Sequence, residues 1–326
     1  MRLRRPSKGD ATKSETTALL ARHKEMVALP AKRPRIGLAL GGGGARGLAH
    51  VVALEAFDEM GIKPDVIAGT SIGAIYGAAY AAGLSGTEIR AHTEEALSQR
   101  FDLVRQVLSA RADPVSWLLK FLPIRPAFLD PVALLEALLP SAMPKTFEGL
   151  KIPLRVVCCD FYAQSQVVLS RGDLKRAVAA SMTLPVLFAP LQIDGRAMVD
   201  GGFVNPLPFD VVAPECDISV AIDVSGGVPE DQNGKMVPPS SLEVMSASSQ
   251  ILQRSIVREK LKSAQPDILI ECAVGAFSLV DFHRWRDVIK AAEPVKDQLK
   301  RQLDRVLGSE TILIADGAKD LPRKIT

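Results

Sequence analysis

A short turn between glycines, Gly69–Gly73, constrains the fold of this chain more than any other feature of its sequence. It reads Gly-Thr-Ser-Ile-Gly and lies between an apolar run at residues 65–68 and an alanine-rich stretch at residues 74–82. The first flank is typical of a buried strand and the second of a helix. Glycines on either side of Ser71 remove the side chains that would clash in so sharp a turn. The pattern therefore predicts a strand, a tight turn and a helix, with Ser71 as a candidate nucleophile for acyl transfer.

A run of glycines at residues 41–47 reads Gly-Gly-Gly-Gly-Ala-Arg-Gly and follows a short apolar segment at residues 36–40. The segment is typical of a buried strand, and apolar residues recur at helical spacing over residues 45–60. Consecutive glycines allow several backbone N–H groups to point at one anion, because no Cβ stands in the way. Arg46 adds a positive charge beside them. We therefore interpret this loop as a candidate oxyanion site.

The same loop also fits a dinucleotide-binding fingerprint, because Gly42, Gly44 and Gly47 have the spacing G-x-G-x-x-G. That function requires an acidic residue near the end of the second strand, where it binds the ribose. The second predicted strand ends at Gly69, and Asp65 precedes that strand instead of following it. The arrangement disfavours a dinucleotide site, and no cofactor is expected.

A serine nucleophile needs a base that accepts its proton. No histidine of the chain lies in a loop of the kind that holds a catalytic histidine; the four are His23, His50, His92 and His283. Asp200 does lie in such a loop, because it ends a predicted strand and is followed by Gly201 and Gly202. A buried carboxylate beside the serine can take the proton directly, since desolvation raises its basicity. The alternative interpretation of Asp200 is a turn residue that accepts hydrogen bonds from its own backbone.

The order of the predicted elements indicates an α/β fold. Strand and helix alternate over residues 36–82, which favours parallel pairing of the first two strands. Hydrophobic residues make up 47% of the 326 residues but aromatic residues only 5%, so we expect an aliphatic core. The dipeptide Asp194-Gly195 between two short runs predicts a hairpin with a type I′ turn. Further strands are predicted at residues 154–158, 166–169, 218–224 and 267–270, and further helices at residues 173–182 and 281–307.

The first 36 residues are strongly basic, with ten Lys or Arg against three Asp or Glu, whereas the whole chain has a net charge of only +3. We predict that residues 1–35 form a partly disordered arm and that residues 36–326 form one domain. Two interpretations of the arm remain open, a solvated tail and a segment that contacts an anionic membrane surface. Nucleic acid is not expected as a partner.

The sequence predicts no secretory signal and no transmembrane helix. The arm lacks a continuous apolar segment, and Gly, Ser and Thr interrupt the most apolar longer stretch, residues 66–84. We therefore expect a cytoplasmic or peripheral membrane location.

Three other parts of the sequence have less specific patterns. The four cysteines, Cys158, Cys159, Cys216 and Cys272, match no metal-binding spacing, so we expect free thiols and no metal site. Residues 98–146 form an irregular apolar stretch that covers a lipid-sized pocket or packs as ordinary helices. Residues 225–241 are rich in Gly, Pro and polar side chains, which predicts a mobile loop.

Taken together, the glycine loop with Arg46, the Gly69–Gly73 turn and Asp200-Gly201-Gly202 resemble the motifs of the patatin-like phospholipase family. The segments 151–157, 180–190 and 202–208 are also similar to segments of that family. The resemblance covers about residues 35–225, with the three motifs in the expected order. Residues 163–166, Ala-Gln-Ser-Gln, depart from the Thr-Gly-Glu-like turn that family members often have, which affects the expected shape of that loop only.

The resemblance implies a three-layer α/β/α fold with a mostly parallel central sheet. It also implies a catalytic dyad of Ser71 and Asp200, an oxyanion hole and no metal. The expected oxyanion residues are Gly42, Gly43, Gly44 and Arg46, and the expected motif glycines are Gly47, Gly69, Gly73, Gly201 and Gly202. The implied activity is hydrolysis of acyl esters of phospholipids, lysophospholipids or simpler lipids. The alternative is a lipid-binding or regulatory protein that keeps the fold with little turnover.

Overall fold

The structure is a computed structural model that describes residues 33–99, 143–184, 188–226 and 241–317, with residues 131, 132, 135, 139 and 140. The chain divides into two compact units, one formed by Arg35–Gly308 and the other by Met1–Pro34 with Ser309–Thr326. The fold described below is that of the first unit. The predictions for nearly all of the basic arm, for most of residues 98–146 and for residues 227–240 lie outside the described residues.

In the described part of the chain, eight strands form one sheet in the order β5-β6-β3-β2-β1-β7-β8, with β4 paired to β3. The strands β3, β2, β1, β7 and β8 are parallel, and β4, β5 and β6 pair antiparallel with their neighbours. Their bounds are β1 (Ile36–Leu40), β2 (Val66–Thr70), β3 (Leu154–Asp160), β4 (Ser165–Leu169), β5 (Leu191–Ile193), β6 (Arg196–Asp200), β7 (Ile218–Asp223) and β8 (Ile268–Glu271).

The principal helices are α2 (His50–Glu59), α3 (Ile72–Ala81), α4 (Gly86–Gln99), α8 (Leu174–Ser181), α9 (Phe209–Val212), α10 (Ser241–Ser263), α11 (Trp285–Ala292) and α12 (Pro294–Gly317). Short 3₁₀ helices are η1 (Gly44–Ala49), η3 (Phe147–Gly149), η4 (Gly201–Phe203), η5 (Ala213–Glu215) and η6 (Phe282–Arg284). The helix predicted over residues 45–60 therefore begins as the 3₁₀ helix η1 and becomes α-helical at His50. Within the described residues, no helix is both long enough and apolar enough to span a bilayer.

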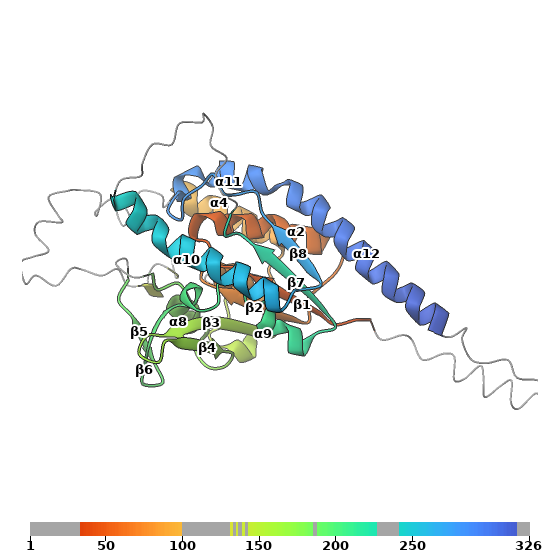
Figure 1. Cartoon of the computed structure of the whole chain (residues 1–326), viewed down its shortest axis with the longest axis horizontal. Helices are drawn as coiled ribbons and strands as arrows, with labels where there is room; N and C mark the ends of the chain where they lie inside the picture. The colour runs from red at the N-terminus through yellow and green to blue at the C-terminus, as the bar shows by residue number, and fades with distance from the viewer. Residues whose placement is uncertain are drawn as a thin grey trace, which may run out of the picture. The chain divides into compact units, whose positions relative to one another are not determined.

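Apolar side chains cover both faces of the sheet, which places it between two helical layers. On one face, Leu38 and Leu40 of β1 join a core formed with α2, α3, α11 and α12. On the other face, Ala39 joins a second core with Phe209 of α9 and Val257 of α10. In Figure 1, α2, α4 and α11 lie together at the top of the view. The predicted three-layer α/β/α fold with a mostly parallel sheet is confirmed.

The topology brings the predicted functional segments to one edge of the sheet. β1 and β2 are parallel neighbours, so the glycine loop and Ser71 leave the sheet at their adjacent carboxyl ends. β2 ends beside Val157 of β3. The next residue of β3, Cys158, lies opposite Asp200 at the end of β6. The antiparallel strand β6 thus delivers Asp200 to the edge at which parallel α/β sheets bind their ligands.

The hairpin between β5 and β6 has the predicted turn. Asp194 has a φ of 50° and Gly195 a φ of 75°, and two positive φ values at the central residues define a type I′ turn. The prediction from the dipeptide is confirmed, and the hairpin fixes the register that leads to Asp200.

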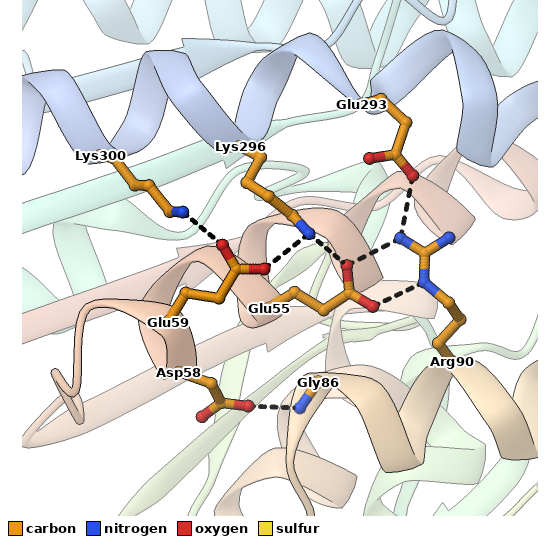
Figure 2. A network of polar contacts seen from close by, with 8 residues as sticks. All are labelled: Glu55, Asp58, Glu59, Gly86, Arg90, Glu293, Lys296 and Lys300. Atoms are coloured by element: carbon orange, nitrogen blue, oxygen red, sulfur yellow. Dashed lines mark hydrogen bonds and ion pairs between the residues drawn. The ribbon is translucent and has the colours of Figure 1, made fainter.

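A network of charged side chains holds α12 against α2 and α4 (Figure 2). Glu55 of α2 accepts hydrogen bonds from Arg90 at 2.6 and 2.8 Å and pairs with Lys296 at 2.9 Å. Burial would raise the pKa of Glu55, but the hydrogen bonds from Arg90 and Lys296 outweigh it and hold that pKa below its usual range. The other members of the network are Glu59, Glu293 and Lys300. These ion pairs fix the helical layer that contains α3, the helix that follows the candidate nucleophile.

Candidate active site

Ser71 occupies a strained turn between β2 and α3. Its φ of 55° and ψ of −123° lie outside the regions that non-glycine residues usually adopt. The neighbouring glycines are required by close packing. A Cβ at Gly73 would lie 2.2 Å from the carbonyl oxygen of Leu40, and a Cβ at Gly69 would lie 2.6 Å from the backbone N of Ala74. The predicted strand, turn and helix are present, and the strain is of the kind found at functional sites.

Ser71 and Asp200 form a direct side-chain pair. The Ser71 hydroxyl donates a hydrogen bond to Oδ2 of Asp200 at 2.7 Å. The other carboxylate oxygen, Oδ1, accepts from the N–H of Gly202 at 2.7 Å. Asp200 is only 1% exposed and Ser71 8%. Burial raises the pKa of Asp200 to about 6, and this effect exceeds the lowering of the pKa by the hydrogen bonds from Ser71 and Gly202. The carboxyl group is therefore a stronger base than an exposed aspartate and is still ionised at neutral pH.

The end of α8 holds the backbones of both residues of this pair. The N–H of Ser71 donates to Oγ of Ser181 at 2.8 Å, and the Ser181 hydroxyl donates to the carbonyl oxygen of Val157 at 2.6 Å. The N–H of Asp200 donates to the carbonyl oxygen of Thr183 at 3.1 Å. The sequence interpretation gave Ser181 no role. The signals that include Ser181 are the similarity of segment 180–190 to a family segment and a serine at the end of an apolar helix, which is equally typical of an ordinary helix terminus.

The glycine loop lies against the serine, but its amides differ in availability. A Cβ at Gly42 would lie 3.5 Å from Cβ of Ser71. The N–H of Gly42 donates to the carbonyl oxygen of Pro206 at 2.8 Å. In the described part of the chain, the N–H groups of Gly43 and Gly44 have no acceptor. One of the three predicted oxyanion amides, that of Gly42, is therefore engaged within the protein.

Arg46 is buried and bonded to the backbone of two distant loops. It donates from Nε to the carbonyl oxygen of Phe277 and from a terminal nitrogen to that of Ser225, both at 2.6 Å. Burial lowers the pKa of Arg46 to about 10, so the guanidinium remains charged at neutral pH. Gly47, the next residue, contacts α3, because an added Cβ would lie 2.1 Å from the Ile72 side chain. These contacts fasten the glycine loop to its surroundings.

His50 is part of the scaffold beneath the glycine loop. Its Nε2 lies 2.8 Å from the carbonyl oxygen of Gly41, which requires a proton on Nε2. Burial lowers the pKa of His50 to about 4, so the ring is neutral at physiological pH. His92 lies on α4 and His283 on η6. His23 lies outside the described residues. The structure therefore pairs the Ser71 hydroxyl with the carboxylate of Asp200, whereas His50 binds the carbonyl oxygen of Gly41.

Cys158 is the thiol nearest in register to the pair, opposite Asp200 in the sheet. Burial raises the pKa of the Cys158 thiol, and the negative charge of Asp200 raises it further by a smaller amount. The thiol therefore stays protonated at neutral pH. The part of the chain that the structure describes contains no cluster of three His, Cys, Asp or Glu side chains suited to a metal ion.

Comparisons with known proteins identify the family. The sequence model of the patatin-like phospholipase family matches residues 38–213. An uncharacterized NTE family protein of Mycobacterium tuberculosis is 35% identical over 196 residues, which are 59% of this chain and 50% of that protein. Patatin-like phospholipase domain-containing protein 7 of Rattus norvegicus is 34% identical over 192 residues, which are 58% of this chain and 13% of that protein.

A solved structure is also similar. The crystal structure of VipD from Legionella pneumophila superposes with a TM-score of 0.45 at 16% sequence identity, over 82% of this chain and 67% of VipD. The chain spans half the length or less of the two curated relatives named above. The family match covers more than half of the 326 residues. The chain belongs to the patatin-like phospholipase family.

Proposed function

We propose that this protein is a serine hydrolase that cleaves carboxylic esters of lipids, with Ser71 as nucleophile and Asp200 as base. The observation that carries the proposal is the 2.7 Å hydrogen bond from the Ser71 hydroxyl to the carboxylate of Asp200. Burial raises the pKa of this carboxylate to about 6. Membership of the patatin-like phospholipase family supports a lipid ester as substrate. The substrates proposed are phospholipids, lysophospholipids or simpler acyl esters.

The first half of the reaction transfers the acyl group to the enzyme. Oγ of Ser71 attacks the ester carbonyl carbon, while its proton passes to Oδ2 of Asp200. Negative charge develops on the carbonyl oxygen, and the N–H groups of Gly43 and Gly44 stabilise it. The C–O bond to the alcohol then breaks, and the departing alkoxide takes the proton from Asp200. The acyl group is left as an ester of Ser71.

The second half releases the acid. A water molecule attacks the acyl carbon, and Asp200 takes its proton. The bond to Oγ breaks and Ser71 regains a proton from Asp200, so the dyad returns to its starting state. Arg46 acts through the loop, since its hydrogen bonds to the carbonyls of Phe277 and Ser225 hold the glycine amides in place.

Kinetics of two variants test this proposal with a soluble p-nitrophenyl ester. We expect Ser71→Ala and Asp200→Asn each to lower kcat/KM by at least about 10³-fold with an unchanged circular dichroism spectrum. The losses should not add in the double variant, because the two residues act as one unit. Wild-type turnover in either folded single variant would refute the dyad.

The domain boundary and the membrane contact are proposed as well. We propose that residues 36–326 form the hydrolase domain and that the basic residues within 1–35 contact anionic lipid headgroups. Deletion of residues 1–34 should reduce co-sedimentation with anionic vesicles at low salt and leave hydrolysis of a soluble ester unchanged. Equal co-sedimentation of the full-length and shortened proteins would contradict the membrane contact.

A further inference from the structure

The hairpin of β3 and β4 extends beyond the sheet at the edge where the candidate active site lies. β2 ends at Thr70, which pairs in register with Val157, and β3 continues past that level to Asp160. Because β2 and β3 are parallel, these additional residues lead away from the carboxyl end of β2, where the turn at Ser71 begins. Phe161 follows Val157 by four residues, a distance of about 13 Å along a strand. The hairpin therefore projects past the candidate nucleophile.

The turn at the end of this hairpin exposes two aromatic side chains. Phe161 is 54% exposed and Tyr162 82%, and their rings contact each other edge to face with centroids 5.1 Å apart. The backbone of the turn is anchored. The N–H of Phe161 donates to the carbonyl oxygen of Ala197 on β6 at 2.9 Å, and the N–H of Tyr162 donates to Oδ1 of Asp160 at 3.1 Å. The two rings thus extend from a fixed backbone into solvent, although burial against a partner would be favourable.

A second exposed apolar pair lies on α10, beside the 3₁₀ helix η4 that follows Asp200. Ile251 and Leu252 are both more than half exposed. The next residue, Gln253, is buried against η4, because a Cβ added to Gly202 would lie 2.9 Å from its Nε2 atom. Gly202 in turn donates its N–H to Oδ1 of Asp200. α10 therefore exposes apolar side chains next to the segment that holds the candidate base.

A further exposed apolar residue, Val280, lies beside the glycine loop. The residue before it, Leu279, accepts the N–H of Ala45 on its carbonyl oxygen at 2.8 Å. Six large hydrophobic side chains are exposed among the residues that the structure describes, and five of them belong to these three segments. The exception is Val168 of β4, which pairs with Val157 within the sheet. Single scattered residues need no explanation, but apolar side chains that gather around one site indicate a surface that binds a partner.

We propose that this edge of the molecule docks on the surface of a lipid bilayer, with Phe161 and Tyr162 inserted among the lipids. The choice of a lipid as partner rests on the function proposed above, since the surface that docks here lies against the segments around Ser71. Aromatic residues are favoured at the boundary between hydrocarbon and headgroups, where a tyrosine ring is buried while its hydroxyl stays hydrated. Docking at this edge supplies the ester directly from the lipid phase.

The charge beside the aromatic pair also suits a lipid surface. Arg196 directly precedes Ala197, whose carbonyl oxygen accepts the N–H of Phe161. The Arg196 side chain is exposed, and its Nε lies 3.9 Å from Oδ2 of Asp160, a long distance for an ion pair. A guanidinium group binds phosphate well. Aromatic rings for the hydrocarbon and an arginine for the headgroup phosphate together match the two layers of a bilayer surface.

Vesicle binding tests the proposal in full-length Ser71→Ala protein, so that no lipid is cleaved during the measurement. We expect this protein to co-sediment with phosphatidylcholine vesicles. Addition of Phe161→Ser and Tyr162→Ser should lower the partition coefficient at least about tenfold, because two aromatic side chains no longer enter the lipid. The same loss should appear at high salt, since salt does not screen apolar burial, whereas the basic arm requires anionic lipid.

Val168→Ser is the matched control. It makes an apolar-to-serine change at an exposed position of the same hairpin, but at the level of the sheet, and it should bind vesicles as the parent protein does. Circular dichroism and thermal unfolding establish that each variant is folded. Ile251→Ser with Leu252→Ser tests the α10 segment separately. It should lower the partition coefficient about threefold or more, and it keeps the test decisive if the aromatic variant does not fold.

Two outcomes would overturn the docking surface. One is equal vesicle binding by the aromatic variant and its Val168→Ser control, or no binding of the parent protein. The other is a dimer of the parent protein in light scattering that the aromatic variant abolishes, which would identify a second copy of the chain as the partner. Failure of the wild-type protein to cleave any p-nitrophenyl ester would overturn the proposed function, while a loss of vesicle binding in the aromatic variant would still support the docking surface.

Discussion

The backbone N–H of Ser71 donates a hydrogen bond to the side-chain oxygen of Ser181 at 2.8 Å. Ser181 is fully buried, and its hydroxyl donates a hydrogen bond to the carbonyl oxygen of Val157. Two residues later, the carbonyl of Thr183 accepts the N–H of Asp200. A single segment at the end of α8 therefore sets where the nucleophile and the carboxylate lie relative to each other, and it supports a serine held in a strained conformation.

Removal of the Ser181 hydroxyl should impair turnover more than stability. Ser181→Ala leaves the N–H of Ser71 and the carbonyl of Val157 without this partner, at a cost of about 1–3 kcal/mol in unfolding free energy. We expect kcat to fall by about 10- to 100-fold with little change in KM, because the misplaced groups act in the transition state. Ester kinetics and urea unfolding measure the two effects.

Ser219→Ala is the matched control for that variant. Ser219 is a buried residue of strand β7, and its hydroxyl donates a hydrogen bond to Oδ2 of Asp267 at 2.7 Å. Its loss should cost similar stability without a change in kcat. Equal kcat values in both serine variants would contradict the positioning role of Ser181.

The pH dependence of hydrolysis should follow the ionisation of Asp200. Because burial raises its pKa to about 6, the carboxylate is protonated below that pH and cannot accept the serine proton. We expect kcat/KM for a soluble ester to fall tenfold per pH unit below about pH 6 and to be level from about pH 7 upward. A level profile down to pH 4.5 in folded protein would exclude Asp200 as the base.

Replacement of the same carboxylate should stabilise the fold at neutral pH. A buried acid with a raised pKa destabilises the folded state at pH values above that pKa, because it is then ionised. This destabilisation disappears as the pH falls toward 3.8, the pKa of the group in the unfolded chain. We expect Asp200→Asn to gain about 1–3 kcal/mol in unfolding free energy at pH 7.5 and almost nothing at pH 4. Urea unfolding at both pH values checks this, and a variant less stable than wild type at pH 7.5 would contradict it.

The glycine loop should act through the orientation of its amides. Gly43 has an extended φ of 174°, but a Cβ there would lie 2.8 Å from the Val224 side chain, so Gly43→Ala must shift the loop. We expect kcat to fall about 100-fold. Gly308→Ala introduces the same methyl on α12, where nothing in the described structure lies within 4 Å, and it should leave kcat unchanged. Equal kcat values for the two glycine variants would argue against an oxyanion role of the loop.

Local patterns predicted the strand, turn and helix around Ser71 and the strand that ends at Asp200, because each depends on neighbours in the sequence. The turn around Ser71 is specified by its own glycines, and the hairpin before Asp200 by Asp194-Gly195. The engagement of the Gly42 amide could not be predicted, since its acceptor, Pro206, lies far along the chain. The same holds for Ser181, whose partners come from β2 and β3. Contacts between distant segments decide which groups of a motif are free, and a motif alone does not encode them.

The measurement that tests the central claim most directly is labelling with a fluorophosphonate, followed by intact mass and peptide mapping. An activated serine is phosphonylated, whereas an unactivated one is not. We expect wild-type protein to gain one adduct, mapped to Ser71, and Ser71→Ala and Asp200→Asn to gain none under the same conditions. Labelling at another residue, or labelling of Asp200→Asn at the wild-type rate, would contradict a nucleophile activated by Asp200.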